Sequence, residues 1–265
     1  MKYMIHACPK RMWYVNDFLI PDMLRQGISV DDIIIWNDEK EEGNLTAWRK
    51  SCEYIKGNFP VEEGIWHLQD DVVLSNDFAE KSVEMAKMDM IVNAFVSKRA
   101  NPKKYASVGK RLVRRYWFSF PCLYIPNRYI HSFVRWYYEN GVVEEPYKSV
   151  IDQNKGDDYL FWVAVKVFHR TEYIYNLAPN LADHIDYLLG GSVCNGQRGG
   201  YATAEYFEDH KKVEELALAI QEYNAKKEAE KKAAPKAKKP TTRKKTTSTT
   251  KRRTSTKGTK EENAE

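Results

Sequence analysis

The stretch GIWHLQDDVVLSNDF, residues 64–78, constrains the fold most, because two adjacent acids interrupt an otherwise apolar run. Asp70 and Asp71 follow the first apolar residues, and three aliphatic residues come next. This pattern predicts a buried strand over 64–74 that carries two carboxylates. In open α/β sheets, ligands bind beyond the carboxyl ends of the strands. Adjacent acids in apolar surroundings repel each other, and a divalent cation carrying phosphates relieves that repulsion most naturally.

The same stretch fits a simpler interpretation. An Asp commonly ends a strand, and Ser75 or Asn76 would then start the next helix as its cap. Two adjacent acids are not diagnostic of a ligand site, so a structural role and a binding role both stay open here.

Apolar strands alternate with amphipathic helices along the first 180 residues, which predicts an α/β fold with a mostly parallel sheet covered on both faces. The expected strands are 2–8, 32–38, 64–74, 89–96, 116–126 and, last, 171–179. The expected helices run from Pro9 to about Leu24, over 44–58, 75–88, 129–138 and 159–168. Pro21 is a point at which the first helix bends or divides.

The C-terminal end differs in charge from the rest of the chain. Residues 226–265 contain 15 Lys and Arg and five Asp and Glu, and the whole chain carries a net charge of +5, so residues 1–225 carry −5. We predict a globular domain over 1–202, a charged helix over 203–232 and a disordered Lys/Thr-rich tail over 233–265, which lacks large apolar residues.

The four cysteines lie far apart without a C-x-x-C pair, which argues against a zinc site or a disulfide framework. They are Cys8, Cys52, Cys122 and Cys194. No stretch is long and apolar enough for a signal peptide or a membrane span. The sequence therefore predicts a soluble protein of a reducing cytoplasm.

Five short motifs, taken in order, resemble a nucleotide-sugar glycosyltransferase of the GT-A fold over residues 1 to about 200. They are the N-terminal strand and helix, the Asn37-Asp38 strand end, the LQDDV element in the place of the Asp-x-Asp motif, Gly156-Asp157-Asp158 before a helix, and the segment Pro179 to His184. Gln69 departs from the pattern, because it stands where the first Asp is usual. The resemblance implies a Rossmann-like domain.

The resemblance also implies a metal-dependent reaction with a UDP-sugar as donor. Asp71 would be the direct ligand of Mn²⁺ or Mg²⁺, bridging to the donor diphosphate, and His184 would be the second protein ligand. Carboxylate oxygens suit both cations, and an imidazole favours Mn²⁺. A histidine that caps a following helix is the alternative for His184.

Several further residues are expected at the donor. By the resemblance, Asp70 would lie near the ribose or sugar, Asp38 would contact the ribose or base, and His6, Ala7 and Pro9 would line the base. Arg49 is a candidate for the sugar or diphosphate, since guanidinium matches phosphate oxygens. Glycines at 190, 191, 199 and 200 suggest a lid that brings Arg198 to the diphosphate. For Asp38 a turn, for Arg49 a solvated helix face and for the glycines an ordinary loop stay open.

Asp157 and Asp158 open a helix, where carboxylates cap well. In the resembling family an acid at this point activates the acceptor hydroxyl as a general base, and Asp158 is the first choice over Asp157.

Basic residues suggest a nucleic-acid acceptor. The segment 98–115 has no acid, and the tail resembles those of histone-like DNA-binding proteins. The expected DNA-binding residues are Lys103, Lys104, Lys110, Arg111, Arg114, Arg115, Lys244, Lys245, Arg252 and Arg253. A phage-type enzyme that glycosylates 5-hydroxymethyluracil or 5-hydroxymethylcytosine in DNA, in the host cytoplasm, is the preferred hypothesis. A glycosyltransferase of cell-surface glycans and a non-enzymatic architectural DNA binder remain as alternatives, and such tails also bind membranes or merely solubilise.

Overall fold

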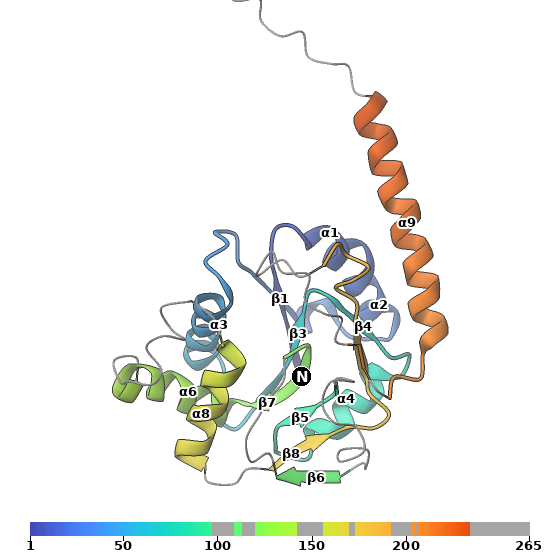
Figure 1. The fold of residues 1–265 in the computed structure, drawn as a ribbon. Helices are drawn as coiled ribbons and strands as arrows, with labels where there is room; N and C mark the ends of the chain where they lie inside the picture. The colour runs from blue at the N-terminus through green and yellow to red at the C-terminus, as the bar shows by residue number, and fades with distance from the viewer. Residues whose placement is uncertain are drawn as a thin grey trace, which may run out of the picture. The chain divides into compact units, whose positions relative to one another are not determined.

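The computed structural model describes residues 1–96, 109–112, 120–141, 156–169, 173–191, 203–204 and 206–233. The chain divides into two compact units, Met1–Asn224 and Ala225–Glu265. The first unit is a Rossmann-like α/β domain in which helices flank a mostly parallel central sheet, so the predicted fold class is confirmed (Figure 1). In the second unit, the described residues 225–233 are helical. The predicted tail, 233–265, lies almost entirely outside the described residues.

Among the described residues, seven strands form the central sheet in the order β2-β1-β3-β7-β5-β8-β6. Their bounds are Lys2–Ala7 for β1, Ile33–Asn37 for β2, Gly64–Gln69 for β3, Val92–Asn93 for β5, Gly109–Leu112 for β6, Cys122–Pro126 for β7 and Tyr173–Asn176 for β8. β1 pairs in parallel with β2 and β3, and β5 pairs in parallel with β8. β7 is antiparallel to β3 and β5, and β6 is antiparallel to β8. Five strands therefore share one direction, and β7 and β6 oppose it.

Helices cover both sides of this sheet, with α3, α6 and α8 on one side and α1, α2 and α4 on the other (Figure 1). The bounds are Met12–Tyr14 for α1, Ile20–Arg25 for α2, Asn44–Asn58 for α3, Phe78–Ala86 for α4, Asn127–Trp136 for α6, Asp157–His169 for α8 and His210–Ala233 for α9. A π-helical turn, Val15–Leu19, separates α1 from α2, and Pro21 lies in the first turn of α2. The division expected at Pro21 is thus present. A wider turn accommodates the missing N–H and the ring of a proline.

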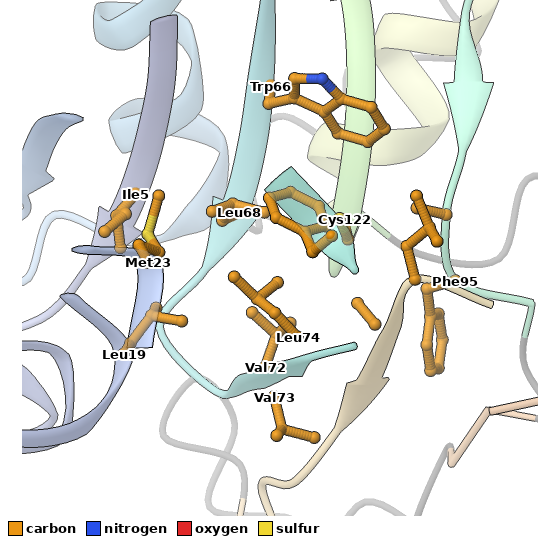
Figure 2. Close-up of a cluster of buried hydrophobic side chains, with 14 of the residues drawn as sticks. Ile5, Leu19, Met23, Trp66, Leu68, Val72, Val73, Leu74, Phe95 and Cys122 are labelled. Atoms are coloured by element: carbon orange, nitrogen blue, oxygen red, sulfur yellow. The ribbon is translucent and has the colours of Figure 1, made fainter. Parts of the chain in front are cut away.

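Two hydrophobic clusters form the core, one on each face of the sheet, because successive side chains of a strand point to opposite faces. Met4 and Ile65 pack with α3, α6 and α8. Ile5, Trp66 and Leu68 pack on the other face with α1, α2 and α4. Figure 2 shows this second cluster, in which side chains of β4 lie below the strands of the central sheet.

A second sheet of two antiparallel strands lies beside the first and contains β4, Val72–Leu74, and β9, Ala182–His184. The prediction of one strand over 64–74 is therefore wrong: β3 ends at Gln69, the chain turns at Asp70 and Asp71, and β4 joins another sheet. The apolar residues on both sides of the acids are all buried, so hydrophobicity alone does not reveal the change of sheet.

Other boundaries also differ from the predictions. The basic segment 98–115 contains a strand, β6, and the predicted strand over 89–96 is reduced to the two residues of β5. The strand over 171–179 is not the last one, because β9 follows it. Helix α4 begins at Phe78 rather than at Ser75, and α9 at His210 rather than at Thr203. The direction of β7 depends on its neighbours, which a local sequence pattern does not specify.

Among the described residues, no helix is both long and apolar enough to cross a bilayer. Cys8, Cys52 and Cys122 are free thiols. Cys194 lies outside the described residues.

Candidate functional site

The turn between β3 and β4 places Asp70 and Asp71 at the carboxyl end of β3, beside the end of β1. His6 of β1 pairs with Gln69 of β3, so the chain that leaves β1 passes directly over the acid pair. The backbone N–H of Cys8 donates to Asp70 Oδ2 at 2.8 Å. Both carboxylates are buried, with exposed fractions of 7% for Asp70 and 6% for Asp71. The edge of the sheet predicted to bind a ligand thus contains two buried acids.

Arg11 is the cation that makes this burial tolerable, and the sequence analysis did not assign it a role. Its Nη1 donates to Asp70 Oδ1 at 3.1 Å and to Asp71 Oδ2, and its Nη2 donates to the carbonyl oxygen of Gly191 at 2.9 Å. The residue is only 4% exposed. One signal pointed to it: Arg11 follows the first strand closely, and the carboxyl ends of parallel strands lie at one edge of a sheet.

His184 approaches the acid pair from the second sheet. β9 pairs His184 with Val72, the residue that follows Asp71, and His184 Nε2 lies 3.0 Å from Asp71 Oδ2. His184 Nδ1 lies 3.6 Å from Asp186 Oδ1, a carboxylate that the sequence analysis overlooked. The structure thus brings the two predicted metal ligands together. The alternative of a helix cap for His184 does not apply, because it ends a strand.

The pKa values in this cluster follow from burial and charge. Burial and the negative charge of Asp71 raise the pKa of Asp70 above its ordinary value. Burial would also raise the pKa of Asp71, but His184 and Arg11 outweigh it and lower that pKa. Burial would lower the pKa of His184, yet Asp71 raises it. Asp71 is therefore a persistent negative charge at neutral pH.

The donor set suits a divalent cation that keeps most of its positions for a ligand. Asp71 and His184 supply a carboxylate and an imidazole, and Asp71 Oδ1 is buried without a hydrogen-bond partner among the described residues. In that same part of the chain, no three His, Cys, Asp or Glu side chains gather as a metal cage. Mn²⁺ and Mg²⁺ commonly take one or two protein carboxylates and complete their shells with phosphate or water, so the two residues fit.

Asp38 lies at the same edge and shapes the turn after β2. Its Oδ1 accepts from the N–H of Glu42 at 3.0 Å, its Oδ2 accepts from that of Gly43 at 3.2 Å, and its own N–H donates to Ala7 O at 2.8 Å. Asp38 thus stabilises the turn after β2, as in the alternative left open for it. Of the predicted base-lining residues, Ala7 is buried, His6 is partly buried and Pro9 is the most exposed.

His6 and His67 form a pair beneath helix α3. His6 Nε2 lies 2.9 Å from His67 Nδ1, and the Trp48 ring lies 5.2 Å from the His6 ring. Burial lowers the pKa of His6 to about 4, and burial together with His6 lowers the pKa of His67. Both rings are therefore uncharged at neutral pH.

Arg49 does not join the acid pair. It lies on α3, where its Nη1 contacts Glu53 and donates to Tyr138 Oη at 2.6 Å. Its guanidinium also lies over the ring of Tyr137, 5.5 Å from the centroid. These contacts agree with the alternative of a helix-face role.

Asp157 and Asp158 occupy the first turn of α8, within the helix that they were expected to precede. Burial and the charge of Asp158 raise the pKa of Asp157 to about 7, and burial raises that of Asp158. The next turn carries Phe161, whose ring lies 5.6 Å from that of Trp48. Trp48 in turn contacts His6, so aromatic packing links α8 to the strands that end at the acid pair.

The remaining predicted residues are Arg198 and the basic residues expected to bind DNA. Lys110 and Arg111 belong to β6. Those outside the described residues are Lys103, Lys104, Arg114, Arg115, Arg198, Lys244, Lys245, Arg252 and Arg253.

Comparison with known proteins gives weak likenesses only. No protein-family model and no curated protein matches the sequence. Among solved structures, the apo form of the glycosyltransferase GlyE of Streptococcus pneumoniae TIGR4 is 15% identical with a TM-score of 0.33, over 66% of this chain and 44% of GlyE. A glycosyltransferase involved in glycosylation of the major capsid of PBCV-1 is 12% identical with a TM-score of 0.32, over 66% of this chain and 93% of that one. The chain thus spans less than half of GlyE. Both TM-scores lie below 0.5, so conclusions about activity depend on the site itself.

Proposed function

We propose that this protein is a nucleotide-sugar-dependent glycosyltransferase of the hexosyltransferase type, with a UDP-sugar as donor. The observation that supports it most is the buried turn of Asp70 and Asp71 at the carboxyl edge of the sheet, with His184 Nε2 3.0 Å from Asp71. An open α/β sheet binds its ligands at this edge. The diphosphate of the donor would bind at the turn, and the nucleoside would extend toward Asp38 and Pro9.

Asp71 and His184 would hold Mn²⁺ or Mg²⁺ at this turn. The cation, when bound, neutralises the charge that develops on the departing diphosphate. Asp70 is fixed by the N–H of Cys8 and by Arg11, so its carboxylate is positioned before any ligand arrives. Asp186 lies beside the other nitrogen of His184, in the manner of carboxylates that orient metal-binding imidazoles.

Asp158, or its neighbour Asp157, would accept the proton of the acceptor hydroxyl. The acceptor oxygen forms a bond to the anomeric carbon of the sugar, the bond between sugar and diphosphate breaks, and the nucleoside diphosphate leaves. A carboxylate whose pKa is raised toward neutrality is a better general base than an ordinary one, and Asp157 has this property.

A 5-hydroxymethylpyrimidine in DNA is the proposed acceptor. The excess of ten positive charges in residues 226–265 supports it, because such a segment binds phosphates with release of counterions. The base would have to be turned out of the duplex for its hydroxyl to reach an aspartate. A phage-encoded enzyme of the host cytoplasm would meet such DNA.

Transfer is tested by incubating the protein with UDP-glucose, Mn²⁺ and DNA that contains 5-hydroxymethyluracil or 5-hydroxymethylcytosine, followed by mass spectrometry of the nucleosides. A hexose adduct that disappears with Asp71→Ala supports the proposal. Release of UDP without a DNA adduct would keep the enzyme and favour a cell-surface glycan as acceptor. Binding of DNA without binding of UDP would instead favour an architectural DNA-binding protein.

Deletion of residues 226–265 tests the DNA partner separately from the chemistry. The truncated protein should still hydrolyse the donor, while its affinity for duplex DNA falls and the slope of log K against log salt becomes shallower by several units, since each lost phosphate contact removes about 0.9. Gel shifts over a salt series measure this. Unaltered affinity and slope would mean that the tail does not bind DNA.

A further inference from the structure

Arg11 contacts the carboxylate that a metal ion at this site would share with His184. Its Nη1 contacts Asp71 Oδ2, the same oxygen that faces His184 Nε2 at 3.0 Å. The Arg11 side chain is 5% exposed and that of Asp71 is 9% exposed, so water screens the pair little. A fixed cation therefore already offsets one negative charge of the acid pair without any ligand.

This arrangement leaves several polar atoms unsatisfied. Arg11 Nε, Asp71 Oδ1 and His184 Nδ1 are buried without a hydrogen-bond partner among the described residues. Buried polar atoms without partners are costly, and native structures contain few of them. Three such atoms in one cluster indicate that its bonding is completed by something that enters the site.

We infer that Arg11 is a resident cation which competes with the divalent metal for Asp71 and passes to the donor diphosphate when metal and nucleotide bind together. This inference rests on the proposed function. Arg11 and a divalent ion repel each other at the distances that a shared carboxylate imposes. A diphosphate offers the guanidinium a new anion, which it can bind through two parallel hydrogen bonds.

A coupling between metal and nucleotide follows from this exchange. Metal alone must displace Arg11 without giving it another anion, so it should bind weakly. With the nucleotide present, Arg11 has an acceptor for its hydrogen bonds, and the metal should bind more tightly. Each ligand must then increase the affinity for the other by the same factor.

Titration of Mn²⁺, followed by electron paramagnetic resonance and calorimetry with and without UDP, tests the exchange without turnover. In the full-length wild type, UDP should tighten Mn²⁺ binding by tenfold or more. Arg11→Gln should bind Mn²⁺ alone at least tenfold more tightly than the wild type does, and UDP should tighten this binding by a smaller factor than in the wild type. Arg25→Gln is the matched control, because it removes an exposed arginine that pairs with Asp22, and it should behave like the wild type.

Thermal unfolding adds a second measurement. Without metal, Arg11→Gln should unfold at a lower temperature than the wild type, because the acid pair has lost its cation. Added Mn²⁺ should remove this difference in unfolding temperature. If Arg11→Gln does not fold, Arg11→Lys replaces it. Lysine keeps the positive charge but not the guanidinium that contacts both carboxylates, so an intermediate gain in Mn²⁺ affinity is expected.

Three results would count against the inference. Arg11→Gln, or Arg11→Lys in its place, with wild-type affinity for Mn²⁺ and wild-type coupling to UDP would overturn it while leaving the metal site of the proposed function intact. Wild-type protein that binds Mn²⁺ alone as tightly as with UDP would do the same. Failure of both wild type and variant to bind Mn²⁺ in the presence of UDP would remove the proposed metal site and the inference together.

Discussion

Two of the protein's three Asp-Asp pairs lie in contrasting surroundings. Asp70 and Asp71 lie at a strand end, where Arg11 and His184 hold the pKa of Asp71 below its usual value. Asp157 and Asp158 lie in the first turn of a helix, and among the described residues no basic side chain lowers the pKa of Asp157, which burial and its neighbour raise to about 7. The same dipeptide therefore gives one persistent charge and one group that titrates near neutrality.

This difference matches the two tasks of a group-transfer site. A carboxylate that stays ionised suits the binding of a cation, whereas a carboxyl group with a pKa near 7 suits proton transfer. Environments that move the pKa values of similar groups apart commonly distinguish such roles in enzymes. The proposed division of roles, with binding at the first pair and base catalysis at the second, uses this difference.

Replacement of Asp71 by Ala should give the largest effect. His184 alone does not hold a hard cation, so metal-dependent affinity for the nucleotide-sugar should fall by roughly a thousandfold or more. The fold should survive, because Asp70 remains to pair with Arg11. Calorimetry with UDP and Mn²⁺ measures the loss. Wild-type turnover by Asp71→Ala would show that the first pair is not the metal site.

Replacement of Asp157 or Asp158 by Asn should affect proton transfer and leave donor binding unchanged. Donor affinity should stay nearly constant while kcat falls by roughly a hundredfold, as expected for removal of a general base. An effect confined to Asp157→Asn would exchange the roles of the two residues. Loss of donor binding in either variant would place this pair at the donor and remove the contrast with the first pair.

The pH dependence of kcat sharpens the same comparison. A general base must be deprotonated, so a base with a pKa near 7 should make kcat fall about tenfold for each pH unit below 7 and level off above it. This limb should be absent from the residual activity of the variant that lacks the base. If kcat of the wild type stays constant from about pH 5 to about pH 8, neither aspartate acts as the base.

The uncharged pair of His6 and His67 should give the smallest effect, on stability. The pKa of His6 is lowered to about 4, so its contribution to stability is present above pH 6.5 and is lost as the pH falls from 6.5 toward 4. His6→Gln should make the free energy of unfolding less dependent on pH in this window, by about 3 kcal/mol at most. Urea unfolding at several pH values measures it, with the exposed His210→Gln as control. Equal pH dependence in the wild type and His6→Gln would show that His6 is not buried uncharged.

The sequence by itself determined the fold class and directed attention to the candidate site. Alternating strands and helices are recorded in local hydrophobic periodicity, and the carboxyl ends of parallel strands share one edge, so Asp38 and Asp70 were expected at that edge. The pairing of Asp71 with His184 was expected from the resemblance alone, since they lie 113 positions apart in the sequence.

Only the tertiary structure decided which partners those residues have. The turn that sends β4 into a second sheet, the reversed direction of β7 and the short strand β9 all depend on contacts between distant segments, which no local pattern contains. Arg11 reaches Asp71 across 60 positions of sequence. Nothing in the sequence around Arg11 distinguishes a buried arginine from a solvated one. Burial and neighbouring charge set the opposite pKa shifts of Asp71 and Asp157, and both are properties of the folded chain.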